Sequence, residues 1–429
     1  MQGDSSRISE AASFAGTALD PARGPAAADM TWLVSYQDVD EVFRSRDFEQ
    51  GGGGRRDSEP FVGHGLLSLS GDDHFERRRV EAPLFRRPAL RRYESDVLAP
   101  ALRASLLGCD RDADGVVRCE LQRVVRLALC RVSATLVGID GIDTPASVDR
   151  YLWFMDRLSA GVNIEWMSRD HREIIREGLE VRNLFDQELF GPSWRRREAL
   201  VARYRAGEIG LEALPVDLLT IVLLNPEHFG KWGPDIAMRE TLLFNGAPTN
   251  TITSAVPHVV QELSDWFTRH PEDRPRTEEI DFLRKAIAEG LRLHPASPYL
   301  IRCAVRETRL QSGRTVREGE YVVLDLVKAS LDPAVFGPDP TRFDPHRVPL
   351  ARVRPMGLAF GDGPHTCIGL SMSIGEAGAS DDAPLGLAVY ILRELYRAGV
   401  RLDPAHPPRW NDANVRNEYA AFPVCFDRL

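Results

Sequence analysis

The chain has 429 residues, 43% of them hydrophobic, with 54 Lys and Arg against 63 Asp and Glu and a formal charge of −9. This is the composition of a globular protein with a large core, and it excludes a disordered, collagen-like or small disulfide-built chain. The acidic balance argues against nucleic acid as a partner, because phosphate backbones are bound by concentrated basic surface. The sequence has no apolar run of 18 residues and no basic-then-apolar leader, so we predict a cytoplasmic protein without a membrane partner.

The chain order predicts an N-terminal extension over residues 1–30 and one domain over residues 31–429, because no repeat or linker composition divides the latter. Residues 31–48 predict a short strand, a turn and an amphipathic helix. Four glycines at residues 51–54 precede Arg55 and Arg56 and predict an irregular loop, either a lid or plain surface.

Most of the following sequence has helical periodicity. Apolar residues recur at intervals of three and four from residue 74 to about residue 295. Short β-branched runs split by glycines predict small hairpins over residues 300–330, and the Pro-, Asp- and Gly-rich residues 332–364 predict an irregular segment that serves a site. The six cysteines form no CxxC pair, which indicates reduced thiols. We therefore predict a mainly α protein with a minor β region.

The most informative stretch runs from Phe360 to Gly369 and reads Phe-Gly-Asp-Gly-Pro-His-Thr-Cys-Ile-Gly. Its glycines let the backbone curl so that N–H groups point at the sulfur of Cys367, which favours the thiolate and a metal bound to it. The alternative is an inert cysteine in a buried turn of small residues.

This string resembles the cysteine-ligand loop of the cytochrome P450 (haem-thiolate) family, of the soluble bacterial type. The resemblance implies a single-domain cytochrome P450 fold and haem b (iron protoporphyrin IX) as cofactor. It makes Cys367 the axial iron ligand, with Phe360, Gly361 and Gly369 shaping the loop against the haem.

Two further motifs fit the same family. Glu289 and Arg292 stand three apart on a predicted helix, and the resemblance implies that an arginine of the intervening segment, which we assign to Arg342, closes a structural network with them. His74 and Arg78 stand four apart on one helical face. The resemblance implies that they bind the haem propionates, because imidazole and guanidinium donors suit carboxylates.

Two more positions match propionate contacts of the family, Arg302 and His365. Each of these side chains taken alone is more often a surface charge. All four occur in register with Cys367.

The central helix, expected over residues 236–268, departs from the family pattern of glycine, any residue, an acid and then threonine. The corresponding text, from Gly246 to Thr249, has Pro248 at the acid position. Three readings are open: Thr249, Asn245, Thr251 or a substrate group arranges water; peroxide is the oxidant; or the reaction needs no O–O cleavage.

The peroxygenase branch of the family also has Pro-Thr here, but after an arginine, where this chain has Ala247. The plain alternative is that Pro248 removes one helical hydrogen bond and kinks the helix. A second departure is the interruption at residues 375–384, which predicts a short helix after the cysteine loop and a new one near Leu385.

The resemblance also implies a mainly apolar substrate pocket with a few polar anchors. Its expected lining is Phe244, Asn245, Ala247, Pro248, Pro298, Tyr299 and Leu300, with residues 150–172 and 417–422 as roof and far wall. A cluster of arginines suits an acidic electron carrier such as a ferredoxin or flavodoxin, unless it is simply a solvated face: Arg77, Arg79, Arg86, Arg87, Arg91 and Arg92.

Taken together, these features predict a haem-thiolate monooxygenase that oxidises a small organic molecule of specialised metabolism, free or tethered to a carrier protein. The alternatives are a peroxide-using or rearranging enzyme of the same fold, and a non-catalytic recruitment module of that fold.

Overall fold

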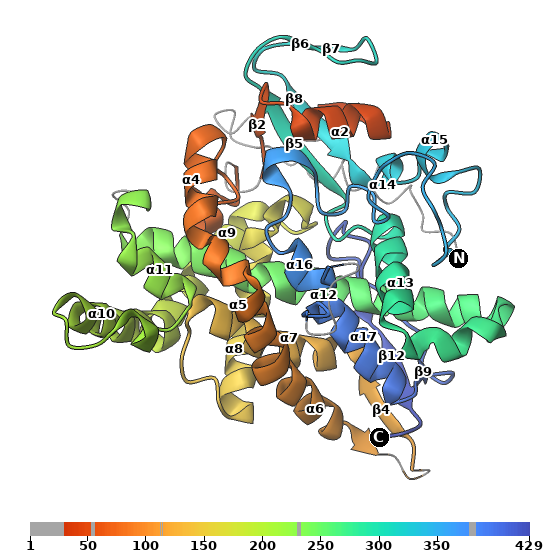
Figure 1. Cartoon of the computed structure of the whole chain (residues 1–429), viewed down its shortest axis with the longest axis horizontal. Helices are drawn as coiled ribbons and strands as arrows, with labels where there is room; N and C mark the ends of the chain where they lie inside the picture. The colour runs from red at the N-terminus through yellow and green to blue at the C-terminus, as the bar shows by residue number, and fades with distance from the viewer. Residues whose placement is uncertain (1–29, 53–55, 112, 114, 230–232, 377–382) are drawn as a thin grey trace.

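The computed structural model describes residues 30–52, 56–111, 113, 115–229, 233–376 and 383–429 (Figure 1). Three predictions fall largely outside these residues: the extension over residues 1–30, the second half of the glycine loop with Arg55, and the middle of the interruption at residues 375–384.

The architecture is mainly helical, which confirms the predicted fold class. Figure 1 shows the helices filling most of the molecule, with a β-sheet at one edge beside α2. The α-helices of the described residues are α2 (Tyr36–Arg44), α3 (Glu59–Val62), α4 (Gly71–Glu81), α5 (Arg87–Arg91), α6 (Ala99–Leu107), α7 (Leu121–Val137), α8 (Pro145–Val162), α9 (His171–Phe185), α10 (Gly191–Arg205), α11 (Leu218–Leu224), α12 (Pro234–Arg269), α13 (Ile280–Leu293), α14 (Leu326–Ala329), α15 (Pro333–Phe336), α16 (Leu370–Ile374) and α17 (Leu387–Arg397).

The long helix α12 runs through the middle of the fold and contacts α7, α8, α13 and α17. It remains one helix of 36 residues although Pro248 and Pro257 lie inside it. Because Pro248 has no N–H, the carbonyl of Phe244 lacks its helical donor. Within the described residues, no helix is long and apolar enough to cross a membrane.

Two four-stranded sheets accompany the helices. The first has the order β1-β8-β5-β2, with β1 (Thr31–Leu33) parallel to β8 (Tyr321–Asp325), and β5 (Tyr299–Ala304) antiparallel to β8 and to β2 (Phe48–Gln50). The second has the order β3-β4-β12-β9 and joins β3 (Asp110–Arg111), β4 (Val117–Glu120), β12 (Pro423–Phe426) and β9 (Val400–Leu402). The small pairs β6 (Thr308–Arg309) with β7 (Thr315–Val316), and β10 (Arg409–Trp410) with β11 (Tyr419–Ala421), complete the β structure. The predicted strand, turn and helix over residues 31–48, and the hairpins over residues 300–330, are confirmed.

The helix after the cysteine loop is interrupted as predicted. The short α16 ends at Gly375, whose φ of +68° favours glycine. A Cβ atom on Gly375 would lie 2.2 Å from the carbonyl oxygen of Leu385, so the backbones of these two residues pack directly against each other before α17 begins.

Candidate functional site

The turn that carries Cys367 is built by backbone hydrogen bonds and two glycines. The Cys367 N–H donates to the Phe360 carbonyl over 2.9 Å, and α16 begins directly after Gly369. Gly361 and Gly363 have φ near +64° and +65°. A Cβ on Gly363 would lie 2.5 Å from the Phe43 carbonyl oxygen, so this position admits no larger residue without a shift of α2.

The Cys367 side chain is exposed and yet surrounded by protein. Burial raises the pKa of its thiol, and the backbone N–H of Gly369 and the charge of Arg78 oppose that rise. A side chain that is accessible while its surroundings are desolvated lines an interior space rather than the outer surface. The thiol therefore faces a region enclosed by the fold.

Cationic and imidazole side chains from three parts of the chain gather beside the cysteine loop. The rings of His74, on α4, and His365, in the cysteine loop, lie 3.9 Å apart between centroids, and Gln50 Nε2 lies 3.0 Å from His365 Nδ1. Arg302, on β5, is 4% exposed. The structure thus brings together His74, Arg302 and His365, with Arg78 one turn along α4 from His74.

In the described part of the chain, neither Arg78 nor Arg302 forms an ion pair with a carboxylate, although the charge of Glu81 acts on Arg78. The side-chain hydrogen bond of Arg302 goes to the Ile301 carbonyl at 3.0 Å. Burial lowers the pKa of Arg302 to about 10, and burial with the charges of Arg78 and Arg302 lowers the pKa of His74 to about 4. A buried charge without a partner is costly, so this arrangement fits a bound ligand that carries carboxylates.

The network around Glu289 forms, but with a different third member. Arg292 donates to both oxygens of Glu289 at 2.7 and 2.8 Å and is fully buried. Arg347, not Arg342, closes the network, since Arg347 Nε donates to Glu289 Oε1 over 2.9 Å. The prediction of Arg342 was wrong because that residue is exposed and contributes only its carbonyl, which accepts from Arg347 Nη2 at 2.6 Å.

Helix α12 presents two opposite faces around Pro248. Asn245 and Thr249 face α7 and α8: Ser133 Oγ donates to the Asn245 carbonyl at 3.4 Å, and the Tyr151 hydroxyl donates to Asn245 Oδ1. Both Asn245 and Thr249 are fully buried, and Thr249 Oγ1 donates to the Asn245 carbonyl at 2.6 Å.

Ala247 and Thr251 lie on the other face. Two residues along an α-helix rotate a side chain by roughly 200°, so Ala247 points away from the face that carries Asn245. Ala247 is exposed although it lies in the middle of the central helix, and Thr251 Oγ1 donates to its carbonyl at 2.6 Å. Of the three polar candidates on α12, Thr249 and Asn245 are therefore packed against α7 and α8, and half-buried Thr251 lies on the opposite face with Ala247.

If Thr251 is the threonine of the family pattern, the residue that replaces the acid of that pattern is Asn250 and not Pro248. The residue before Thr251 is Asn250, whose Nδ2 donates to Ser159 Oγ of α8 over 3.0 Å. An amide, held by α8, thus stands next to Thr251. The sequence from Gly246 to Thr249 alone assigned Pro248 to the acid position and Thr249 to the threonine position of the family pattern. Only the helical phase relative to α7 distinguishes the two threonines.

The predicted pocket residues do not all lie in one place. Phe244 is 4% exposed and packs on Phe85 at 5.7 Å between ring centroids. Pro298 is buried as well, and Leu300 lies on the same strand face as Arg302. Tyr299 points to the opposite face of β5, where it packs on Trp32 and its hydroxyl donates to the Glu165 carbonyl. Tyr299 therefore belongs to a buried aromatic cluster.

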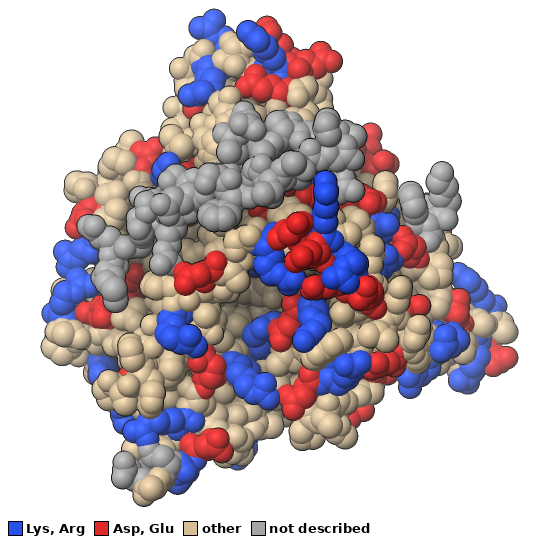
Figure 2. All heavy atoms as spheres, turned by 180° about the vertical axis from the view of Figure 1, so that it is seen from behind, with Lys and Arg blue, Asp and Glu red and all other residues tan. Residues whose placement is uncertain are grey.

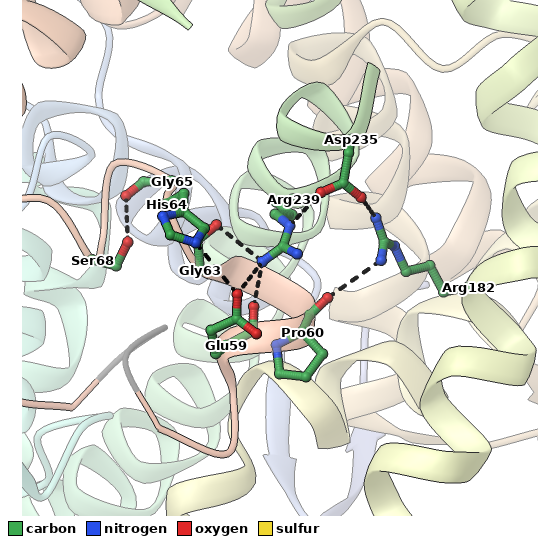
Figure 3. Close-up of polar contacts among 9 residues, drawn as sticks. All are labelled: Glu59, Pro60, Gly63, His64, Gly65, Ser68, Arg182, Asp235 and Arg239. Atoms are coloured by element: carbon green, nitrogen blue, oxygen red, sulfur yellow. Dashed lines mark hydrogen bonds and ion pairs between the residues drawn. The ribbon is translucent and has the colours of Figure 1, made fainter. Parts of the chain in front are cut away.

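The segment around α3 is fastened to α9 and α12 by arginines (Figure 3). Arg239 donates to the carbonyls of Glu59 and Gly63 at 2.6 and 3.3 Å and to Asp235 Oδ2 at 2.7 Å. Asp235 also pairs with Arg182 of α9. Three separate elements thus share one ion-pair network at the start of α12.

Phe61, on the same segment, fills a gap between two helices. A Cβ added to Gly161 of α8 would lie 2.5 Å from the Phe61 ring, and one added to Gly178 of α9 would lie 2.6 Å from it. Phe61 itself is fully buried. Asp57 Oδ2 lies 2.6 Å from His171 Nδ1 at the start of α9. The α3 segment is therefore docked against the α8–α9 pair.

Several arginines of the predicted cluster form ion pairs with carboxylates of the same chain. Arg77 is buried and pairs with Glu240, while Arg79 pairs with Glu76 and Arg87 with Glu376. Arg86 and Arg91 remain exposed. On the opposite face of the molecule, Figure 2 shows both signs of charge interspersed around a hollow near the middle.

Comparison with known proteins agrees with this geometry. A family model described as Cytochrome P450 matches residues 258–378. Cyclooctat-9-en-7-ol 5-monooxygenase of Streptomyces melanosporofaciens is 27% identical over 366 residues, which are 78% of this chain and 74% of that protein. Several other relatives match over a shorter stretch, and the chain spans 34–35% of their length.

Solved structures share the fold over nearly the whole chain. CalO2 has a TM-score of 0.70 at 21% identity and covers 99% of this chain and 98% of its own. P450BioI, solved in complex with an acyl carrier protein ligated with hexadec-9Z-enoic acid, has a TM-score of 0.67 at 18% identity over 92% of each chain. The family model, the relatives and the shared fold support a cytochrome P450. A cytochrome P450 implies a haem-iron cofactor.

Proposed function

We propose that the chain is a haem b monooxygenase that oxidises a small organic molecule of specialised metabolism with electrons from a ferredoxin or flavodoxin. The observation that carries the proposal is the accessible thiol of Cys367 in a desolvated setting, together with buried Arg302, which forms no ion pair with a carboxylate of the described residues. A haem satisfies both features at once, because it offers iron to the thiolate and two propionates to the cations.

The residues present fit that group. Cys367 would ligate the iron, and His74, Arg78, Arg302 and His365 would hold the propionates. Bound haem supplies oxygen activation at iron, with electron density donated by the thiolate. The turn around Cys367 keeps its sulfur in place and offers it the Gly369 N–H, which stabilises the thiolate form.

Thr251 is the residue that we assign to proton management on α12. Its hydroxyl donates to the Ala247 carbonyl and keeps its oxygen lone pairs available to a water on the interior side. Asn250 next to it is fixed by Ser159 and has no ionisable proton to contribute. Protons must therefore arrive through water ordered by Thr251 rather than from a neighbouring carboxylate.

The substrate class follows from similarity as a proposal. The Streptomyces relative is named for oxidising cyclooctat-9-en-7-ol, and P450BioI was solved with a carrier-bound fatty acid. We extend from these a mainly apolar substrate, free or tethered to a carrier protein. Exposed Arg86 and Arg91 are the described cations of the predicted cluster that remain available to an acidic electron carrier.

The first test is optical. Purified protein is reduced under carbon monoxide, and the thiolate-type absorption band is compared between the wild type and Cys367→Ser. We expect the band only in the wild type. The ferric protein is then titrated with free compounds and with the same compounds on carrier proteins, with a spin-state change as readout. Turnover with ferredoxin, reductant and dioxygen must follow for a compound that shifts the spectrum.

A second candidate, a peroxide-using enzyme, is favoured by the amide at position 250. Product formation with hydrogen peroxide, combined with none from dioxygen and any electron carrier, would establish that candidate and overturn the monooxygenase proposal. A thiolate band without a spectral shift or turnover for any compound would favour the recruitment module.

A further inference from the structure

Cys109 and Cys119 lie opposite each other where α6 runs into the β3–β4 hairpin. Asp110 pairs with Arg118 across this hairpin, so one step outward along the antiparallel register sets Cys109 opposite Cys119. Directly opposed residues project to the same face of a sheet, with Cα atoms about 4.5–5.5 Å apart. A disulfide requires a Cα separation of about 4.4–6.8 Å. The backbone therefore already offers disulfide geometry.

The two thiols also interact directly. The Cys109 thiol donates a hydrogen bond to the Ser105 carbonyl of α6 at 3.5 Å, and the neighbouring Cys119 thiol lowers the pKa of Cys109. Cys109 is thus the better nucleophile of the pair, and Cys119 is placed to resolve an oxidised Cys109.

The third cysteine of this region points elsewhere. Cys425 on β12 is opposite Arg118, whereas Val424 is opposite Cys119. Neighbouring residues on a strand project to opposite faces, so Cys425 lies on the other side of the sheet from the pair. Cys109 and Cys119 are each partly exposed, which gives a small oxidant access, while Cys425 is buried.

We propose that Cys109 and Cys119 form a peroxide-sensitive dithiol site that closes to a disulfide between the end of α6 and β4. Cys109 attacks hydrogen peroxide, takes one oxygen to become a sulfenic acid and releases water. The Cys119 sulfur then displaces that hydroxyl, so the S–S bond forms and a second water leaves. In sum, two thiols and one hydrogen peroxide give one disulfide and two waters. The site depends on neither haem nor the proposed oxidation of a substrate.

Trypsin makes the test sharp, because it cuts after Arg111 and Arg118 between the two cysteines. Reduced haem-loaded protein is treated with a few equivalents of hydrogen peroxide, blocked with N-ethylmaleimide in denaturant and digested. We expect residues 104–111 and 119–123 to appear as one disulfide-linked species, with the intervening peptide released.

Two variants control the assignment. Cys425→Ser should keep the linked species, and Cys119→Ser should lose it and leave a Cys109 sulfenic acid that dimedone traps. The proposal is overturned if Cys109 and Cys119 are both still blocked by N-ethylmaleimide after peroxide, or if Cys109 links to Cys425 as readily as to Cys119. It is equally overturned if Cys119→Ser leaves no dimedone adduct on Cys109.

Discussion

Thr251 and Thr249 are two residues apart and face opposite sides of α12, which makes them a matched pair for mutation. With Thr251→Ala we expect product formed per electron consumed to fall roughly tenfold or more, because the hydroxyl that orders water on the interior side is lost. The lost electrons should appear as hydrogen peroxide. The measurement is product, reductant consumed and peroxide released in one assay.

Thr249→Val is the control for that prediction. Its hydroxyl is buried against the Asn245 carbonyl, so the loss is one buried hydrogen bond, about 1 kcal/mol of stability, with the product yield per electron retained. Thr251→Ser should restore most of the yield. If Thr249→Val uncouples the reaction and Thr251→Ala does not, the assignment of the two helix faces is wrong.

Arg347 and Arg342 form a second matched pair. Arg347→Ala removes a donor from buried Glu289 and from the carbonyls of Phe336 and Asp339. We expect a stability loss of about 3 kcal/mol, because a buried carboxylate keeps only part of its compensation. Arg342→Ala should change stability by less than about 0.5 kcal/mol. Denaturant unfolding of both variants measures the difference, and equal losses would contradict the network.

These two pairs mark the limit of what the sequence could predict. The cysteine loop was predictable because its glycines and sulfur lie within ten residues and make local contacts. Arg347 lies 58 residues from Glu289, and nothing local distinguishes it from Arg342. Likewise, choosing between Thr249 and Thr251 requires the helical phase of α12 against α7, which is a tertiary fact.

At the scale of elements, the helices and hairpins were predictable from periodicity, but the way they dock was not. The fit of Phe61 against Gly161 and Gly178 joins segments about 100 residues apart. Glycine inside a helix usually costs about 1 kcal/mol relative to alanine, so its presence in α8 and α9 is unfavourable in isolation. The contact with α3 supplies the reason.

A double-mutant cycle tests this docking. Gly178→Ala should destabilise the protein by about 1–3 kcal/mol in spite of the better helix propensity, because the new methyl group would meet the Phe61 ring. Phe61→Ala alone should cost about 3–5 kcal/mol. Combined, the two changes should cost clearly less than their sum, since the space that the Phe61 ring leaves empty accommodates the new methyl group at position 178. Strict additivity in thermal or denaturant unfolding would contradict the contact.

For the whole molecule, the buried charges between distant elements decide how stability responds to pH. Glu81 at the end of α4 is fully buried, and no hydrogen-bond donor of the described residues reaches either of its oxygens. Its neighbour Glu240 on α12 accepts instead from Arg77 and from the Leu66 N–H. Burial, and then the charge of Glu240, raise the pKa of Glu81 well above its usual range. A proton held between the two carboxyl groups satisfies both.

The acid limb of the stability–pH profile, where stability falls toward low pH, is set by His258. Its ring stacks on the ring of His294 between α12 and α13, with 4.2 Å between the ring centroids. Burial and then the charge of His294 lower the pKa of His258 well below 6.5. The unfolded chain therefore binds this proton first as pH falls below about 6.5, and stability declines toward acid. For Glu81 the unfolded chain releases its proton first as pH rises above about 4.5, and stability declines toward the raised pKa of the folded state.

The two limbs are separable by one isosteric change. Glu81→Gln keeps the shape of the protonated carboxyl group and removes its titration, so its free energy of unfolding should exceed that of the wild type increasingly as pH rises above about 4.5. The acid limb set by His258 should remain. Glu76→Gln, exposed on the same helix α4, is the control and should leave the profile unchanged apart from a small offset. The measurement is denaturant unfolding from pH 4.5 to 9. Parallel curves for Glu81→Gln and the wild type would mean that the folded protein holds Glu81 ionised, with the charges of Arg77 and Arg78 compensating the carboxylate in spite of its burial.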